Sequence, residues 1–89
     1  MLSNEDEYRL LEIAKKYKVS KVYLFGSTLD SENGARDIDL GVEGVPDSRY
    51  FEFYGELIFA LSKPVDLVDL KKKTLLNKMI RTEGVLLYG

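Results

Sequence analysis

Two aspartates, Asp37 and Asp39, stand two residues apart in the segment Asp37–Val42. This segment has the length and residue types of a β-strand, in which every second side chain points to the same face. With Cα atoms about 6.5 to 7 Å apart, two like charges repel by about 2 kcal/mol at an effective dielectric constant of about 20. A bound cation removes that cost. The spacing therefore predicts a metal site, although alternating acids also occur on solvated strand faces.

A phosphate-binding turn is predicted next to these acids. The apolar run Lys21–Phe25 reads as a buried strand, and it stops at Gly26-Ser27. A glycine at this point lets backbone N–H groups approach a phosphate, and the serine hydroxyl adds a hydrogen bond.

A third acid comes from the predicted strand Val65–Leu70, which carries Asp66 and Asp69 on opposite faces. Only one of the two can point at the paired aspartates. The chain has no histidine and no cysteine, so a metal site must use oxygen ligands. Mg²⁺ prefers a few carboxylates together with water and substrate phosphates. This donor set is typical of phosphoryl or nucleotidyl transfer.

Composition and motifs exclude several other classes of protein. Without histidine there is no Ser-His-Asp triad and no imidazole zinc site. The segment Asp37–Gly41 lacks the further ligands of an EF-hand, and no Walker-type phosphate loop is present. Thirteen basic and fifteen acidic residues give a net charge of −2, which disfavours sequence-independent nucleic-acid binding. The acidic N-terminus and short apolar runs predict a cytoplasmic protein without a membrane segment.

The predicted elements form one α/β (α+β) domain over residues 1–89, with a small mixed sheet of about four strands flanked by helices. Apolar periodicity predicts helices near residues 4–18, 47–62 and 75–82. Their predicted N-cap residues are, in turn, Ser3 or Asn4, Asp47 or Ser48, and Thr74. Strands are expected at 21–25, 37–42, 65–70 and 85–88, and a polar turn-rich loop at 27–36. The aromatic stripe of the second helix is interpreted as core packing.

Four stretches together resemble a known family. They are FGS at Phe25–Ser27, DIDLGV from Asp37, PVDLVDL from Pro64, and the closing IRTEGVLLY at Ile80–Tyr88. In combination they look like the minimal nucleotidyltransferases (MNT) of the DNA polymerase β superfamily. The resemblance implies the polymerase β-like nucleotidyltransferase fold. It also implies that Gly26 and Ser27 bind the nucleotide triphosphate and that Asp37 and Asp39 bind metal.

The resemblance also implies a role for the third acid. It assigns to Asp66 the part of completing the metal site and helping to activate the incoming hydroxyl, with Asp69 as the less favoured match. One or two Mg²⁺ ions would be the cofactor and ATP the substrate.

Small members of the family resemble the antitoxin half of toxin–antitoxin pairs, whose partner is a HEPN-type ribonuclease toxin. The implied activity is transfer of AMP from ATP to a tyrosine hydroxyl of that toxin. The expected partners are therefore a nucleotide triphosphate and a HEPN-type protein, without direct nucleic-acid or membrane binding; no oligomeric state is predicted.

The loop between serine and aspartate departs from the family pattern. It has nine residues, Thr28 to Arg36, one fewer than is usual, and Leu29-Asp30-Ser31 replaces an Ala-Arg-Gly sequence. Arg36 is the cation that could compensate. This difference motivates an alternative hypothesis, a catalytically degenerate binding module that neutralises its partner by contact alone. A glycosyltransferase metal motif is a weaker alternative, because the chain is short for a nucleotide-sugar domain.

Overall fold

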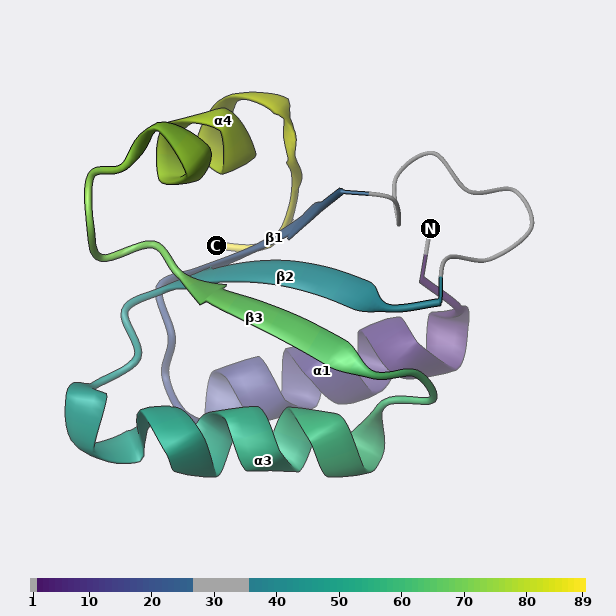
Figure 1. The fold of residues 1–89 in the computed structure, drawn as a ribbon. Helices are drawn as coiled ribbons and strands as arrows, with labels where there is room; N and C mark the ends of the chain where they lie inside the picture. Colours follow the sequence, from purple (N-terminus) through teal and green to yellow (C-terminus); the bar gives the residue numbers. More distant parts are fainter. Residues whose placement is uncertain (1, 27–35) are drawn as a thin grey trace.

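The computed structural model describes residues 2–26 and 36–89 and is drawn in Figure 1. In this described part a four-stranded sheet has helices on both faces. In chain order the elements are α1 (Asn4–Lys16), β1 (Lys21–Phe25), β2 (Ile38–Glu43), the 3-10 helix η1 (Asp47–Arg49), α3 (Tyr50–Ala60), β3 (Val65–Asp69), α4 (Leu75–Glu83) and β4 (Val85–Tyr88). The predicted fold class and the predicted succession of helices and strands are confirmed.

The sheet has the strand order β3-β2-β1-β4. β1 runs antiparallel to both of its neighbours, β2 and β4, whereas β2 and β3 are parallel. Parallel neighbours need a crossover connection, and α3 provides it between β2 and β3. The prediction of a mixed sheet is therefore confirmed, and β3 forms one of its edges.

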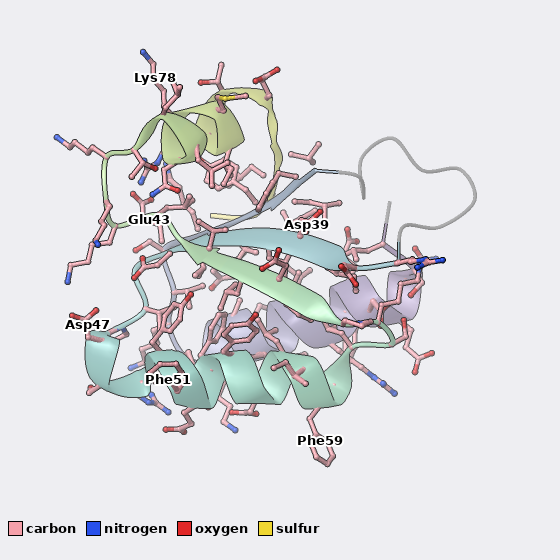
Figure 2. All side chains as sticks on the ribbon, viewed as in Figure 1. Asp39, Glu43, Asp47, Phe51, Phe59 and Lys78 are labelled. Atoms are coloured by element: carbon pink, nitrogen blue, oxygen red, sulfur yellow. The ribbon has the colours of Figure 1, made fainter. Side chains whose placement is uncertain are left out.

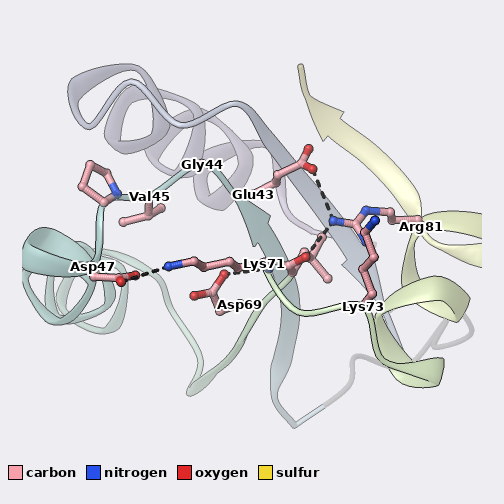
Figure 3. Close-up of a pocket in the computed structure, with 10 residues that line it drawn as sticks. Glu43, Gly44, Val45, Asp47, Asp69, Lys71, Lys73 and Arg81 are labelled. Atoms are coloured by element: carbon pink, nitrogen blue, oxygen red, sulfur yellow. Dashed lines mark hydrogen bonds and ion pairs between the residues drawn. The ribbon is translucent and has the colours of Figure 1, made fainter.

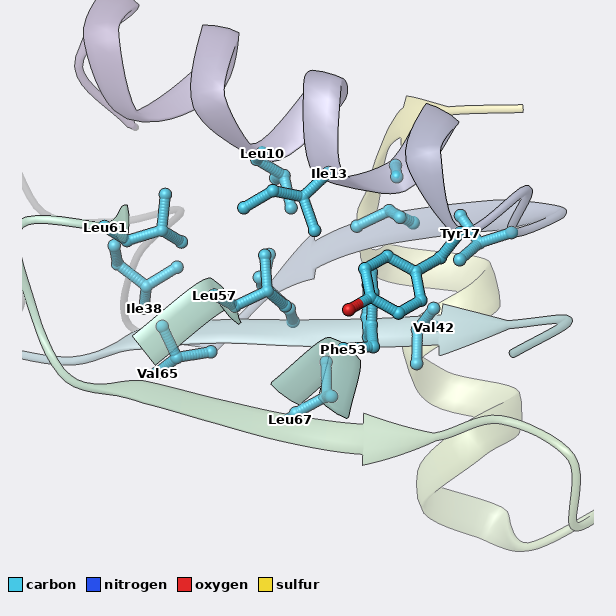
Figure 4. Packing of buried hydrophobic residues seen from close by; sticks show 14 of the residues in the cluster. Leu10, Ile13, Tyr17, Ile38, Val42, Phe53, Leu57, Leu61, Val65 and Leu67 are labelled. Atoms are coloured by element: carbon cyan, nitrogen blue, oxygen red, sulfur yellow. The ribbon is translucent and has the colours of Figure 1, made fainter. Parts of the chain in front are cut away.

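α1 and α3 cover one face of the sheet and enclose the larger core (Figures 1 and 4). β2 sends Ile38, Leu40 and Val42 into this core, each at most 1% exposed, as the alternation of the strand predicts. The ring of Tyr17, the C-cap residue of α1, meets the ring of Phe53 on α3 edge to face, with centroids 5.3 Å apart. Burying an aromatic or large aliphatic side chain stabilises the fold by about 1.5 to 3 kcal/mol.

The start of α1 is fixed by two side chains. The sequence predicted Ser3 or Asn4 as the cap, and in the structure the Ser3 hydroxyl accepts a hydrogen bond from the backbone N–H of Asp6 at 3.1 Å. The buried Asp6 carboxylate in turn accepts hydrogen bonds from the N–H and the hydroxyl of Ser62, at 3.0 and 2.6 Å. α1 is thereby tied to the chain that follows α3.

The helix expected at residues 47–62 is shorter than predicted and begins differently. Asp47 and Ser48 do not cap it but lie in the 3-10 turn η1, which the N–H of Arg49 closes onto the carbonyl of Pro46 at 2.9 Å. Proline fixes its own φ angle and favours such a tight turn. α3 itself follows without a side-chain cap and ends at Ala60.

α4 packs on the opposite face of the sheet and makes a second, smaller core. A Cβ atom at Gly41 would lie 2.9 Å from Ile80 Cγ2 and 3.2 Å from Leu70 Cδ2, so the helix approaches β2 at a position where only glycine fits without a shift. Tyr23 completes this cluster, with Phe25 and Val68 packed against it. Gly41, on the same face of β2 as Asp39, is therefore buried.

Candidate active site

Gly26 and Asp39 meet at the end of β1. The antiparallel register places Phe25 opposite Asp39, so Gly26 follows directly beside the acid of β2. Gly26 has a φ angle of 72°, which side-chain-bearing residues rarely adopt. A Cβ atom there would also overlap the Asp39 carboxylate. Both the backbone conformation and the space beside Asp39 therefore require glycine at this position.

Asp66 stands next to Asp39 in the sheet. The parallel register of β2 and β3 pairs the two residues directly, and residues paired in this way point to the same face, with backbones about 4.8 Å apart. Asp66 is exposed and Asp39 is half-buried. Figure 2 shows Asp39 on the side of the sheet that carries α4, with Phe51 and Phe59 of α3 on the other side. Two neighbouring carboxylates form an oxygen-only donor set that suits a hard cation such as Mg²⁺.

Asp69 takes a different position from Asp66. It is in register with Val42, whose side chain faces the larger core, so Asp69 belongs to the other face of the sheet. Its Oδ1 accepts a hydrogen bond from the backbone N–H of Lys71 at 2.9 Å. Of the two acids on β3, Asp66 is the one that the register brings beside Asp39.

Of the other predicted site residues, Asp37 is described by the structure and Ser27 is not. Asp37 is exposed and immediately precedes β2, which begins at Ile38, one residue later than predicted. Ser27, and with it the altered loop sequence Leu29–Ser31, lies outside the described residues, whereas Arg36 is described and exposed. Among the described residues, no three acidic side chains are already gathered into a metal-binding cluster. The structure thus brings together Gly26, Asp39 and Asp66.

Two tyrosines of α3 contact β3, the strand that carries Asp66. The sequence analysis had assigned these tyrosines only to core packing. The Tyr54 hydroxyl donates a hydrogen bond to the Val65 carbonyl at 2.9 Å and accepts one from the Leu67 N–H at 3.4 Å. The Tyr50 hydroxyl donates to the Leu67 carbonyl at 3.4 Å. The usable signal was the residue type, because a partly buried tyrosine hydroxyl needs a hydrogen-bond partner whereas phenylalanine does not.

A cavity of about 740 Å³ lies at the carboxyl ends of β2 and β3, away from Gly26 (Figure 3). Lys71 Nζ lies 3.0 Å from Asp47 Oδ2, and Arg81 lies 3.2 Å from Glu43 Oε1. The hydrogen bond that Lys71 donates to the Asp47 carboxylate raises the pKa of Lys71 above its ordinary value. Because these cations are paired with carboxylates inside the cavity, its charge is largely balanced. The cavity is a poorer triphosphate site than the turn at Gly26.

The mixed four-stranded sheet with helices on both faces matches the fold of the polymerase β-type nucleotidyltransferases. The model of the family described as polymerase beta, nucleotidyltransferase matches residues 9–89, and the chain belongs to this family. No curated protein gives a significant match to the sequence. In the described part of the chain, no helix is long and apolar enough to cross a membrane.

Solved structures of toxin–antitoxin complexes are similar to the chain. A chain of a toxin–antitoxin complex with AMP-PNP superposes with a TM-score of 0.74 and 28% identity, over 93% of this chain and 73% of that one. The MntA-HepT complex gives a TM-score of 0.71 and 26% identity, over 98% and 73%. A tri-AMPylated Shewanella oneidensis HEPN toxin in complex with its MNT antitoxin gives 0.70 and 28%, over 94% and 70%. The resemblance to minimal nucleotidyltransferases of the antitoxin type is confirmed.

Proposed function

We propose that the protein is a Mg²⁺-dependent adenylyltransferase that transfers AMP from ATP to a tyrosine hydroxyl of a HEPN-type toxin, and so acts as the antitoxin of the pair. The observation that carries this proposal is the direct pairing of Asp39 with Asp66 beside the glycine that ends β1. Two further facts support it. The similar solved structures include one complex with a nucleotide analogue and one with an AMPylated HEPN toxin.

The residues present fit the metal that the family implies. Asp39 and Asp66 offer carboxylate oxygens from neighbouring strands, and Asp37 comes from the residue before β2. The chain has no histidine or cysteine that could act as a nitrogen or sulfur ligand, so the donor set favours Mg²⁺ over zinc or copper. Bound Mg²⁺ would neutralise phosphate charge and make the attacking hydroxyl more acidic. Asp37, Asp39 and Asp66 are the proposed ligands for one or two ions.

The chain's own residues would position the reactants. The tyrosine oxygen of the partner attacks the α-phosphorus of ATP, a new P–O bond forms, and the bond to the departing pyrophosphate breaks. Asp66, the exposed acid of the pair, would accept the proton of that hydroxyl. The turn at Gly26, with the hydroxyl of Ser27, would hold the phosphates through hydrogen bonds. Positioning of the reactants together with electrostatic stabilisation supplies most of the rate enhancement in phosphoryl transfer.

The proposal is tested by incubating the protein with Mg²⁺, labelled ATP and the HEPN-type protein encoded by the neighbouring gene. The expected result is label on the partner with the wild type and none with Asp39→Asn. Equal labelling by both proteins would refute the metal assignment. Tight binding of an unlabelled partner, with no ATP binding by calorimetry, would instead support the catalytically degenerate binding module.

A further inference from the structure

The outer edge of β3 is closed by a side chain from α3 at the position of Asp66. β3 is the last strand on its side of the sheet, so alternate backbone groups point away from β2. On this strand they belong to Val65 and Leu67, the two neighbours of Asp66. The hydroxyl of Tyr54 donates a hydrogen bond to the Val65 C=O and accepts one from the Leu67 N–H. Tyr54 therefore takes the place that a further strand would occupy.

The element that carries Tyr54 is itself firmly held. Phe53 and Leu57, on the same helix, are fully buried in the larger core. The ring of Tyr54 also packs edge to face on that of Tyr50, with centroids 6.3 Å apart, and the Tyr50 hydroxyl reaches the Leu67 carbonyl. A fixed helix thus holds the backbone of β3 through two phenol hydroxyls.

The inner edge of the same segment is held by β2. The Ile38 N–H donates to the Pro64 carbonyl at 2.8 Å, and the register then pairs Asp39 with Asp66. The peptide units on either side of Asp66 are therefore held from both edges, by β2 on one side and by Tyr54 on the other. Since the orientation of its peptide units sets the direction of a strand residue's Cα–Cβ bond, fixing these units fixes the direction in which the Asp66 side chain leaves the strand.

We propose that Tyr54 is a positioning residue that aims Asp66 at the site shared with Asp39 through its hydrogen bonds to the backbone of β3. This inference rests on the proposed function for its catalytic consequence, although the contact itself does not. Tyr54 comes from α3, on the face of the sheet opposite Asp66, and acts only through the β3 backbone. A misplacement of about 1 Å in a catalytic group can cost about 100-fold in rate, so even a small rotation of these peptides has a measurable effect.

The test uses Tyr54→Phe, which removes only the hydroxyl, and Tyr17→Phe as the matched control. The Tyr17 hydroxyl also makes hydrogen bonds beside the larger core, but its acceptors are carboxylates of α3 and not the backbone of β3. The first readout is hydrogen exchange of the Leu67 amide in the protein alone. We expect faster exchange in Tyr54→Phe than in Tyr17→Phe when the two variants are compared at equal overall stability. Equal exchange would overturn the proposal.

The second readout is the rate of transfer to the partner. Tyr54→Phe should lower kcat by about tenfold, within the range that small misplacements cause, and change KM for ATP by less than about twofold. It should also raise the Mg²⁺ concentration needed for half-maximal rate, whereas Tyr17→Phe should leave all three values unchanged. Faster Leu67 exchange without a fall in kcat relative to Tyr17→Phe would contradict a positioning role.

A third readout separates this inference from the proposed function. If the wild type transfers no AMP, the proposed function fails, and binding of Mn²⁺ alone then decides the positioning role. Weaker Mn²⁺ binding by Tyr54→Phe than by Tyr17→Phe, measured by paramagnetic broadening of the Asp66 signal, would support it. Equal broadening in the two variants would overturn it.

Discussion

Asp66 and Asp69 lie on the same strand, yet they differ in every property that matters for the site. Asp66 pairs with Asp39, whereas Asp69 pairs with Val42 and bonds the backbone of Lys71. Asp66→Asn should reduce AMP transfer by at least about 100-fold, because removal of one electrostatic group from such a site has costs of this size. Asp69→Asn, the matched control, should keep transfer within about threefold of the wild type. A steady-state rate assay measures both, and an equal loss in the two variants would disprove the choice of Asp66.

Gly26 allows a second comparison at the scale of the single residue. Gly26→Ala should destabilise the protein by about 1 to 2 kcal/mol, since a Cβ atom is strained at this φ angle and would overlap Asp39. Gly55 of α3 is the control, because a Cβ atom there meets nothing within 4 Å. Gly55→Ala should stabilise the protein by about 0.5 to 1 kcal/mol, since alanine favours a helix interior. Urea unfolding measures both changes, and a destabilised Gly55→Ala would contradict this account.

At the scale of the elements, the hydroxyl of Tyr17 is one of the links between α1 and α3. Tyr17, the C-cap residue of α1, donates hydrogen bonds to Glu52 and Glu56 of α3, and the guanidinium of Arg49 lies 4.3 Å from the centre of its ring. Burial, followed by the bond to Glu56, raises the pKa of Tyr17. The bond from Tyr17, followed by that from Lys16, lowers the pKa of Glu56. The link therefore depends on a neutral tyrosine and a charged glutamate.

The two pKa shifts give this link a defined pH range. A lowered folded-state pKa contributes stability above the unfolded pKa of glutamate, about 4.3, and this stability is lost as the pH falls through the folded value. The raised pKa of Tyr17 contributes stability below about pH 10, and this is lost as the pH rises through the folded value. Tyr17→Phe should therefore lower the unfolding temperature by several degrees at pH 7 and by less at pH 3.

Thermal unfolding of Tyr17→Phe and Tyr54→Phe at the two pH values measures this effect. The Tyr54 hydroxyl bonds the Val65 carbonyl and the Leu67 N–H, which do not titrate, so its removal should cost the same at both pH values. A cost of Tyr17→Phe that does not change with pH would show that the hydroxyl–carboxylate bonds contribute nothing to the link.

The elements themselves were largely predictable, because apolar periodicity and turn residues report local structure. The alternation of apolar and acidic residues around Asp39 correctly predicted that Ile38, Leu40 and Val42 face the core. Register was not predictable, since nothing local states that Asp39 pairs with Asp66 or that Ile80 packs on Gly41. The contact of Tyr54 with β3 is equally non-local. The tyrosine stripe was typical of a buried helix face, and only the fold shows which backbone groups its hydroxyls meet.

At the scale of the whole molecule, the two faces of the sheet differ in how far helices cover them. α1 and α3 close one face with the larger core, whereas α4 covers the other face around Gly41 and leaves Asp66 exposed. A nucleotide bound on that second face would link β1, β2 and β3 through one ligand. Ligand binding should therefore stabilise the entire fold.

ATP with Mg²⁺ at about 100 times its dissociation constant should stabilise the folded state by about 2.7 kcal/mol. For a domain of this size that corresponds to a rise of about 10 to 20 °C in the unfolding temperature. Removal of the metal with EDTA should abolish the rise, and Asp39→Asn should show none. Scanning calorimetry provides the measurement. An equal rise with and without metal would mean that the nucleotide binds elsewhere.

The most direct test of the central claim is the mass of the partner protein after co-expression with this chain. Wild type and Asp69→Asn should each yield a HEPN-type partner that carries AMP on a tyrosine, whereas Asp39→Asn and Asp66→Asn should yield an unmodified partner. The same modification with all four proteins, or an unmodified partner held tightly by the wild type, would contradict AMP transfer at the Asp39–Asp66 site.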